Sequence, residues 1–236
     1  MFFYYDWTYL VLVLPAVVFA MWASYRVNST YERYSQQISS RHVPAEVVAR
    51  MVLDRNGLQY IPIEHVSGNL TDHYDPKANV VRLSDSVWGS CSTAAIGVAC
   101  HEAGHAVQYA EGYSPIIARQ SIIPITNIGS KLAMPLILLG LLFVNSEALS
   151  GTLITLGIAA FGLSTLLQLV TLNVEFDASN RAMKAIETSG YLVGEELDGA
   201  RKTLRAAALT YVAALAVSLM QLLRLILLAN GRKRNK

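Results

Sequence analysis

Charged residues and cysteines are both scarce in this chain of 236 residues. Lys, Arg, Asp and Glu together make up 15% of the sequence, whereas hydrophobic residues make up 53%. Because soluble domains average about 25% charged residues, the composition argues against an ordinary soluble protein. A dispersed net charge of +2 also argues against nucleic-acid binding. Cys91 and Cys100 would lie about 13 Å apart on one helix, so we expect small core residues, not a disulfide or zinc ligands.

The first long uncharged run covers residues 7–25 and is long enough to cross a bilayer as a helix. Aromatic residues lie at both of its ends, and Arg26 follows directly. A cleaved signal peptide is the alternative interpretation. The absence of Lys and Arg before the run, and the presence of Asp6, favour a retained membrane anchor.

Two further uncharged runs, 132–146 and 148–174, indicate a helical hairpin. The first run alone rises only about 22 Å as a helix, which is short for a full span. Either its helix begins earlier, near Asn127, and Lys131 reaches the interface, or the segment enters the membrane and returns to the same face. The second is ample for a span. Small residues at four-residue spacing permit a close helix contact along this run: Gly151, Thr155 and Ala159. A last run, 206–223, is followed by Arg224, which we expect at the interface or in a helix contact.

The segment 101–105 reads His-Glu-Ala-Gly-His and is the main chemical signal of the chain. On an α-helix, His101 and His105 share one face, so both rings can ligate one Zn²⁺. Glu102 then lies close enough to take a proton from a metal-bound water. The alternative is a pair of ordinary histidines on a soluble helix.

The surrounding sequence favours a helix over 93–110, which contains no proline. Ser90 and Ser92 are candidate N-caps, and Gly112 suits a C-terminal stop. A second helix is expected over 44–55.

Short strands are expected at 58–66 and 80–83, joined by a turn-rich stretch. The strand at 80–83 is a candidate edge for binding an extended peptide. Asp72 and His73 belong to the turn-rich stretch, where Asp and Pro have backbone reasons to occur. We also keep both as candidates for contact with the substrate or for support of the metal ligands.

A catalytic zinc requires a third protein ligand. Gln108 and Glu111 stand where a metzincin would have Gly and His, so that pattern is excluded. Glu175, expected at the membrane-proximal start of a helix, is the best candidate, and its alternative role is an interfacial carboxylate that ends the span. Small residues on the same face would let the two metal-binding helices approach: Ala178, Ser179 and Ala182.

The chain resembles the YugP-like neutral zinc metallopeptidases, small bacterial membrane proteins, almost from end to end. The residues that carry the resemblance are the aromatic amino terminus and the segments 70–76, 95–99, 101–105, 174–178 and 206–211. The family is similar in plan to HtpX-like membrane gluzincins, in which a Glu on a later helix completes the site. The resemblance implies one Zn²⁺ per chain, held by His101, His105 and Glu175, with Glu102 as general base. Ser179 departs from the HtpX-like pattern, which has an Asp at that position.

The expected fold is an integral membrane α-helical bundle with a small α+β zincin-like domain of the minigluzincin type. The expected segments are a transmembrane anchor (1–26), a zincin-like domain (27–120), a transmembrane hairpin (121–173), a polar helical insert carrying the third ligand (174–205), a transmembrane helix (206–230) and a basic tail (231–236). His101 and Glu175 must lie on the same side of the membrane to share one ion.

Fourteen of the 19 Lys and Arg residues fall in 26–131 and 181–205, which favours a cytoplasmic catalytic face in a multi-pass protein of the bacterial cell membrane. The basic tail argues for the opposite orientation. The expected partners are the lipid bilayer and a polypeptide substrate, with membrane proteins among the candidate substrates.

The expected function is zinc-dependent endopeptidase activity, with Arg181 as one candidate for contact with the substrate or the oxyanion. The rivals are a site-2-type intramembrane protease that uses Asp198, and a non-catalytic scaffold stabilised by zinc.

Overall fold

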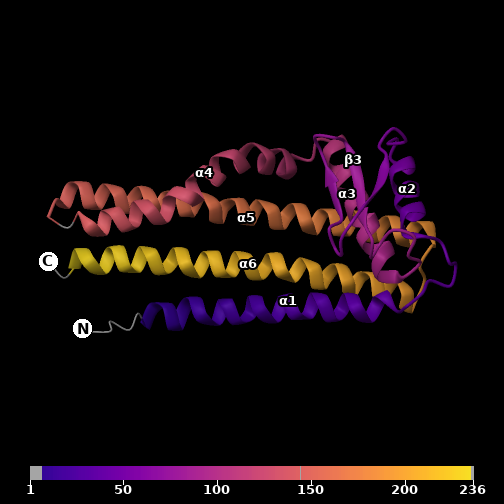
Figure 1. Cartoon of the computed structure of the whole chain (residues 1–236), viewed down its shortest axis with the longest axis horizontal. Helices are drawn as coiled ribbons and strands as arrows, with labels where there is room; N and C mark the ends of the chain where they lie inside the picture. Colours follow the sequence, from indigo (N-terminus) through magenta and orange to yellow (C-terminus); the bar gives the residue numbers. More distant parts are fainter. Residues whose placement is uncertain (1–6, 144, 235–236) are drawn as a thin grey trace. The chain divides into compact units, whose positions relative to one another are not determined.

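The computed structural model describes residues 7–143 and 145–234 (Figure 1). Over these residues the chain is mostly helical, with one small sheet. A π-helical turn, Tyr9–Val13, leads into α1. The helices are α1 (Leu14–Ser35), α2 (Ala45–Arg55), α3 (Thr93–Ala110), α4 (Ser114–Leu142), α5 (Glu147–Ser189) and α6 (Glu195–Arg234). The strands are β1 (Ile63–Val66), β2 (His73–Asp75) and β3 (Val80–Ser84).

Four helices of the described chain are long and apolar enough to cross a membrane: α1 with its preceding π-helical turn, α4, α5 and α6. This confirms the expected membrane-type helical bundle with a small additional domain. Residues 1–6 of the expected anchor, residue 144 of the hairpin and residues 235–236 of the basic tail lie outside the described residues.

Helix α4 is longer than the uncharged run 132–146 that indicated it. It begins at Ser114 and continues past Lys131, with Pro124 and Pro135 inside it. A count of uncharged residues underestimates the length of such a helix, because the backbone hydrogen bonds continue past a charged side chain. At 29 residues, α4 has the length for a full span.

The described chain forms two compact units. The first combines the described parts of 1–22, 118–172 and 211–236, and the second combines 23–117 with 173–210.

In the first unit, the α4 and α5 segments approach closely at two glycines. A β-carbon on Gly140 would lie 3.0 Å from the Ser150 carbonyl oxygen, and one on Gly157 would lie 2.7 Å from the Ala133 carbonyl oxygen. The Ser150 hydroxyl also donates a hydrogen bond of 2.6 Å to the Gly140 carbonyl. Glycine therefore permits this helix packing.

The small residues Gly151, Thr155 and Ala159 do not make this helix contact. Gly151 would meet no atom within 4 Å if it carried a β-carbon, and Thr155 and Ala159 are exposed in the chain. Gly157 lies six residues after Gly151, about a third of a turn around the helix, and it makes the close contact instead. Small residues at regular spacing permit an approach but do not determine which face is used.

The α5 and α6 segments of the first unit are joined by a hydrogen bond of 2.7 Å between the Thr165 and Ser218 hydroxyls. Arg224 lies over the ring of Tyr9, 5.5 Å from its centroid. Arg224 was expected at the membrane interface or in a helix contact, and the structure places it in a helix contact.

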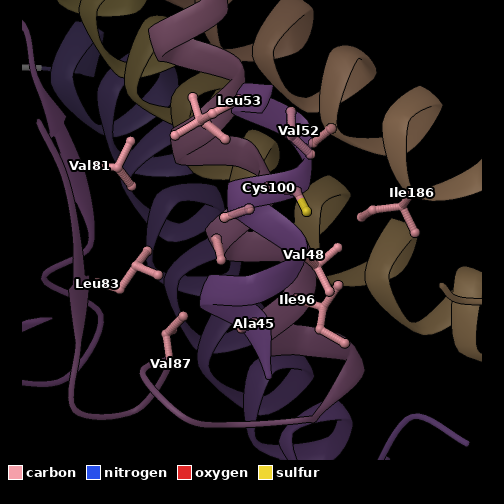
Figure 2. Close-up of a cluster of buried hydrophobic side chains, with 14 of the residues drawn as sticks. Ala45, Val48, Val52, Leu53, Val81, Leu83, Val87, Ile96, Cys100 and Ile186 are labelled. Carbon is pink, nitrogen blue, oxygen red and sulfur yellow. The ribbon is translucent and has the colours of Figure 1, made fainter. Parts of the chain in front are cut away.

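The second unit contains the sheet, in the order β1-β3-β2, with β1 parallel and β2 antiparallel to β3. Its core lies between α2, α3, the sheet, the C-terminal part of α5 and the N-terminal part of α6, and Figure 2 shows part of it. The buried members include Ala45, Val48, Val52, Leu53, Val81, Leu83, Val87, Ile96, Cys100 and Ile186. A rigid core of this kind fixes the position of α3, which carries the histidine motif.

The sequence prediction for the sheet was incomplete. Strand β2 lies in the stretch expected to form turns, and its three residues are too few to show an alternating pattern. The prediction that residues 80–83 form a peptide-binding edge is wrong, because β3 is paired on both sides. The outer strands of the sheet are β1 and β2.

Helix α3 begins and ends as its sequence indicates. Ser92 is the N-cap, and its hydroxyl accepts a hydrogen bond from the Ala95 amide. Gly112 follows the C-cap residue Glu111 with φ of +65°, a conformation that glycine adopts without steric cost.

Candidate metal centre

Three side chains of the second unit converge at one point: His101 and His105 from α3 and Glu175 from α5. Their ligand atoms all lie within 4.8 Å of one another. The Glu175 Oε2 atom is 3.2 Å from His101 Nε2 and 3.5 Å from His105 Nε2. The rings are T-shaped, with centroids 4.7 Å apart. Two residues four apart on one helix thus meet a residue 70 positions later in the chain.

The close approach of α3 and α5 depends on small residues. A β-carbon on Gly104 would lie 2.8 Å from the Ala178 carbonyl oxygen, closer than side-chain atoms normally come. Ala178 and Ala182 are fully buried in the chain. The small face predicted around Glu175 is therefore confirmed as the face that packs against the histidine helix. Glu175 itself lies inside one continuous helix, not at the start of a new one as expected.

Glu102 lies between the two histidines in sequence and is buried. Its Oε2 atom accepts a hydrogen bond of 3.0 Å from the backbone amide of Tyr74 in β2. The Tyr74 ring packs on Tyr109 of α3, with centroids 5.4 Å apart, and its hydroxyl donates to Asn79. Burial, followed by nearby phenols and Asp75, raises the pKa of Tyr74 to about 12, so its hydroxyl remains protonated at neutral pH. Strand β2 is thereby held against the helix that carries Glu102.

The two imidazoles have different partners at Nδ1. His101 Nδ1 lies 3.2 Å from the Ser179 hydroxyl. His105 Nδ1 lies 2.9 Å from Gln108 Oε1. Such partners orient metal-binding rings. Ser179 thus lies beside a histidine although the HtpX-like pattern has an Asp there.

Gln108 is linked in turn to α5. Its amide nitrogen donates hydrogen bonds of 2.8 Å to the Val174 carbonyl and to Asp177 Oδ2. Arg181 binds Asp177 through Nε at 2.5 Å and Glu111 through Nη1 at 2.6 Å. Arg181 therefore reaches the histidine site only through Asp177 and Gln108 in this arrangement.

Burial by itself lowers the pKa of His105, but the hydrogen bond with Glu175 and the charges of Glu102 and Glu175 outweigh it. The net result is a pKa raised above the ordinary imidazole value. In the metal-free chain, the site therefore attracts a positive charge to His105. A divalent cation would satisfy the same electrostatic demand.

The remaining candidates from the sequence have partners elsewhere. Asp72 accepts hydrogen bonds from the Ser84 amide and hydroxyl, at 2.7 and 2.8 Å. His73 Nδ1 lies 2.8 Å from the Thr71 carbonyl, and its Nε2 lies 3.5 Å from Arg82. These contacts fix the turn and the sheet and do not involve the metal-ligand cluster.

Asp198, the ligand required by the site-2-type alternative, forms an ion pair of 3.2 Å with Arg201 on the exposed surface of α6. Both cysteines are free thiols, but Cys91 precedes α3 and is only half-buried, so the expectation of a core residue on the histidine helix holds for Cys100 and not for Cys91. Cys100 is buried in the core, and burial raises the pKa of its thiol.

Sequence reasoning missed the supporting residues Gln108, Asp177 and Tyr74. Gln108 was considered only as a mismatch to the metzincin pattern. Its position three residues after His105 places it on the same helix face, and that spacing was the available signal. Nothing in a single sequence indicates that Tyr74 faces Glu102.

A cavity of about 520 Å³ opens between α2, α3 and α5, with Arg55, Asn180 and Lys184 among its lining residues. Glu111, Asp177 and Arg181 also line it, but none of the three metal-ligand candidates does. It is therefore distinct from the cluster of His101, His105 and Glu175.

The donor chemistry of the cluster fits zinc. Two imidazoles and one carboxylate form a common ligand set of catalytic zinc, which keeps a fourth position for water or substrate. The carboxylate of Glu175 is only 5% exposed, and a buried carboxylate requires a compensating positive charge. A divalent ion between the three ligand atoms would supply it.

The fold and the ligand set define a membrane-type helical protein with a candidate metal-hydrolase centre. The family model described as "Putative neutral zinc metallopeptidase" matches residues 9–230, and the chain belongs to this family. It is 45% identical over 229 residues to "Putative membrane protease YugP" of Bacillus subtilis (strain 168), with 96% of this chain and 99% of that protein covered. No solved structure matches the chain. The resemblance stated from the sequence is confirmed.

Proposed function

We propose that this protein is a membrane-embedded, zinc-dependent metalloendopeptidase that binds one Zn²⁺ per chain through His101, His105 and Glu175. The observation that carries the proposal is the convergence of these three ligand atoms within 4.8 Å. Glu102 on the same helix is the proposed general base. Membership of a zinc metallopeptidase family supports both assignments.

When bound, zinc would acidify a coordinated water and polarise the scissile carbonyl group. Glu102 accepts the proton of the attacking water and delivers it to the leaving amine nitrogen. The Tyr74 amide holds Glu102 Oε2, so the carboxylate has a fixed orientation. This limits the reorganisation that proton transfer requires.

Strand β2 is the proposed binding edge for an extended polypeptide. It is one of the two outer strands of the sheet, and its backbone already reaches Glu102. A peptide that pairs along this edge would bring a scissile bond close to the carboxylate. The proposed substrate class is therefore a polypeptide in extended conformation, including exposed segments of membrane proteins.

We also propose that the segments 27–120 and 174–205 form one zincin-like catalytic domain, with its active face in the cytoplasm. The second compact unit, which combines 23–117 and 173–210, supports the common domain. The distribution of Lys and Arg supports the orientation. The other segments then serve as a multi-pass membrane anchor.

The two rival functions receive less support. A site-2-type protease would use Asp198, which is paired with Arg201 on α6. A purely structural zinc site normally has four closed protein ligands, whereas three candidate ligands group together in the described chain.

The test uses the full chain purified in detergent. We expect one zinc per chain and cleavage of unstructured polypeptides. The Glu102→Gln variant should keep its zinc and lose at least about 100-fold in kcat, the lower range for removal of a general base. Glu187→Gln on the exposed surface of α5 is the matched control and should retain activity. A zinc-free wild-type protein, or an unimpaired Glu102→Gln variant, would contradict the proposal.

A further inference from the structure

We propose that Gln108 is a positioning residue that fixes His105 with its proton on Nδ1 and thereby leaves Nε2 free to bind a metal. The inference rests on the proposed function, because it concerns support of the same site. It adds a residue that lies outside the histidine motif and the ligand set.

The amide of Gln108 is fully buried and has three partners. Its Oε1 atom faces His105 Nδ1 at 2.9 Å, and its Nε2 atom donates to the Val174 carbonyl and to Asp177, each at 2.8 Å. The hydrogen-bonding capacity of the NH₂ group is therefore used completely.

These partners determine the orientation of the Gln108 amide. A carbonyl oxygen and a carboxylate only accept hydrogen bonds, so the NH₂ group of Gln108 must face them. A flipped amide would place its oxygen against two other acceptors in a buried site, at a high desolvation cost. The ion pair of Asp177 with Arg181 holds the carboxylate in place. Oε1 is consequently the only part of the amide that can face His105.

The orientation of the amide determines the tautomer of the ring. Because Oε1 only accepts, His105 Nδ1 must donate to it. A neutral imidazole has one N–H group, so Nε2 carries a lone pair. Nε2 lies 3.5 Å from Glu175 Oε2 on the side where the ligands converge, so a bound metal would take the place of a second ring proton that donates to this carboxylate in the metal-free chain.

Gln108 also joins the two helices that supply the ligands. It belongs to α3, and its acceptors Val174 and Asp177 flank Glu175 on α5. One buried side chain thus fixes the ring of His105 relative to the backbone that carries the third ligand.

His101 has no equivalent constraint. Its Nδ1 lies 3.2 Å from the Ser179 hydroxyl, a group that either donates or accepts. The two histidines of one motif are therefore supported differently, and His105 is the ring whose Nδ1 faces a group that can only accept a hydrogen bond.

The first experiment compares Gln108→Met with Gln59→Met in the full-length, detergent-solubilised protein. Gln59 is exposed and only donates to the Asp54 carbonyl, so its variant is the matched control. We expect zinc affinity, measured by chelator competition, to fall about 10- to 100-fold in Gln108→Met, as for other partners of metal-binding histidines. Gln59→Met should keep the wild-type affinity. Equal zinc affinity in all three proteins would overturn the proposal.

The second experiment exchanges the charge and the amide between the two partners. The double variant combines Gln108→Glu with Asp177→Asn and leaves the net charge unchanged. At position 108 a carboxylate would accept the hydrogen bond from His105, and at position 177 an amide would donate to that carboxylate. Gln108→Glu alone would bring two carboxylates together. The double variant removes that contact and should recover part of the lost zinc affinity, while a carboxylate at position 108 still faces the Val174 carbonyl in both variants. Absence of any recovery, with both variants folded, would contradict the role of the amide orientation.

A third measurement is independent of the variants and of proteolysis. The ¹⁵N spectrum of histidine in the zinc-loaded wild-type protein, with His105 assigned by comparison with His105→Gln, should show a protonated Nδ1 and a metal-bound Nε2 for His105. An Nε2–H tautomer would overturn the proposal even if no Gln108 variant folds. If the wild-type protein binds zinc but cleaves no peptide, the proposed function fails while these results still decide the role of Gln108.

Discussion

Gly104 of α3 and Ala178 of α5 lie so close that a β-carbon on Gly104 would be 2.8 Å from the Ala178 carbonyl oxygen. The nearest neighbour is a backbone atom, which cannot rotate away as the end of a side chain can. Glu175 lies three residues before Ala178 on the same helix, about one turn away. The contact therefore controls how closely the third ligand approaches the two histidines.

Replacing Gly104 by alanine should damage the site without changing any ligand. The added methyl group must push α3 and α5 apart, and overpacking of this kind typically costs about 1–3 kcal/mol. We expect a lower thermal midpoint and weaker zinc binding, measured by thermal unfolding and chelator competition. Gly151→Ala is the matched control, because a β-carbon there would meet nothing within 4 Å. A Gly104→Ala protein with normal zinc affinity would show that the helices adjust more easily than expected.

The identity of the third ligand can be tested with two acid-to-amide substitutions. Glu175→Gln should lower zinc affinity by at least about tenfold, because a neutral amide oxygen replaces the buried carboxylate. Asp198→Asn should have no effect, since Asp198 pairs with Arg201 away from the cluster. The measurement is bound zinc per chain after dialysis. Loss of zinc only with Asp198→Asn would favour the site-2-type assignment.

Zinc should stabilise the protein more at pH 8 than at pH 6. The pKa of His105 is raised in the folded, metal-free chain. Its protonation therefore stabilises the metal-free fold fully below the ordinary value of 6.5, and this contribution is lost as the pH rises through the raised pKa. Zinc binds only the unprotonated ring nitrogen, so zinc affinity should rise as the pH rises. The loss of this one proton accounts for at most about a tenfold increase in affinity per pH unit.

The measurement is the difference in thermal midpoint with zinc and with a chelator, at several pH values. His65→Gln is a suitable control, because His65 pairs with Asp85 on the surface, outside the metal-ligand cluster. A zinc effect that is constant from pH 6 to pH 8 would indicate that His105 is not a ligand.

The features that could be predicted from the sequence are mainly local. The helix of the histidine motif was predictable because its cap residue Ser92, its spacing and Gly112 lie within one short segment. Four membrane-type helices were predictable because hydropathy is a property of each run by itself. Glu175 was identified as a candidate ligand from a resemblance and from the small residues beside it.

The features that could not be predicted depend on tertiary contacts. Strand β2 exists because three residues pair with β3, and a short strand has no periodic signal. The spacing of Gly151, Thr155 and Ala159 permitted a close contact, but it does not reveal that the face of Gly157 is the one that packs. The supporting role of Gln108 could not be predicted because two of its partners lie on a helix 66 to 69 positions further along the chain.

Ser179 should support His101 less strongly than a carboxylate would. Its hydroxyl lies 3.2 Å from His101 Nδ1, and a neutral hydrogen bond is roughly half as strong as a charge-assisted one. We expect Ser179→Ala to weaken zinc binding up to about tenfold, and Ser179→Asp to retain or exceed the wild-type affinity. The matched control is Ser189→Ala on the same helix, where the hydroxyl only donates to the Ile186 carbonyl. If Ser179→Asp binds zinc more weakly than Ser179→Ala, repulsion from Glu175 and Glu102 outweighs the new hydrogen bond, and this support of His101 differs in kind from the HtpX-like pattern.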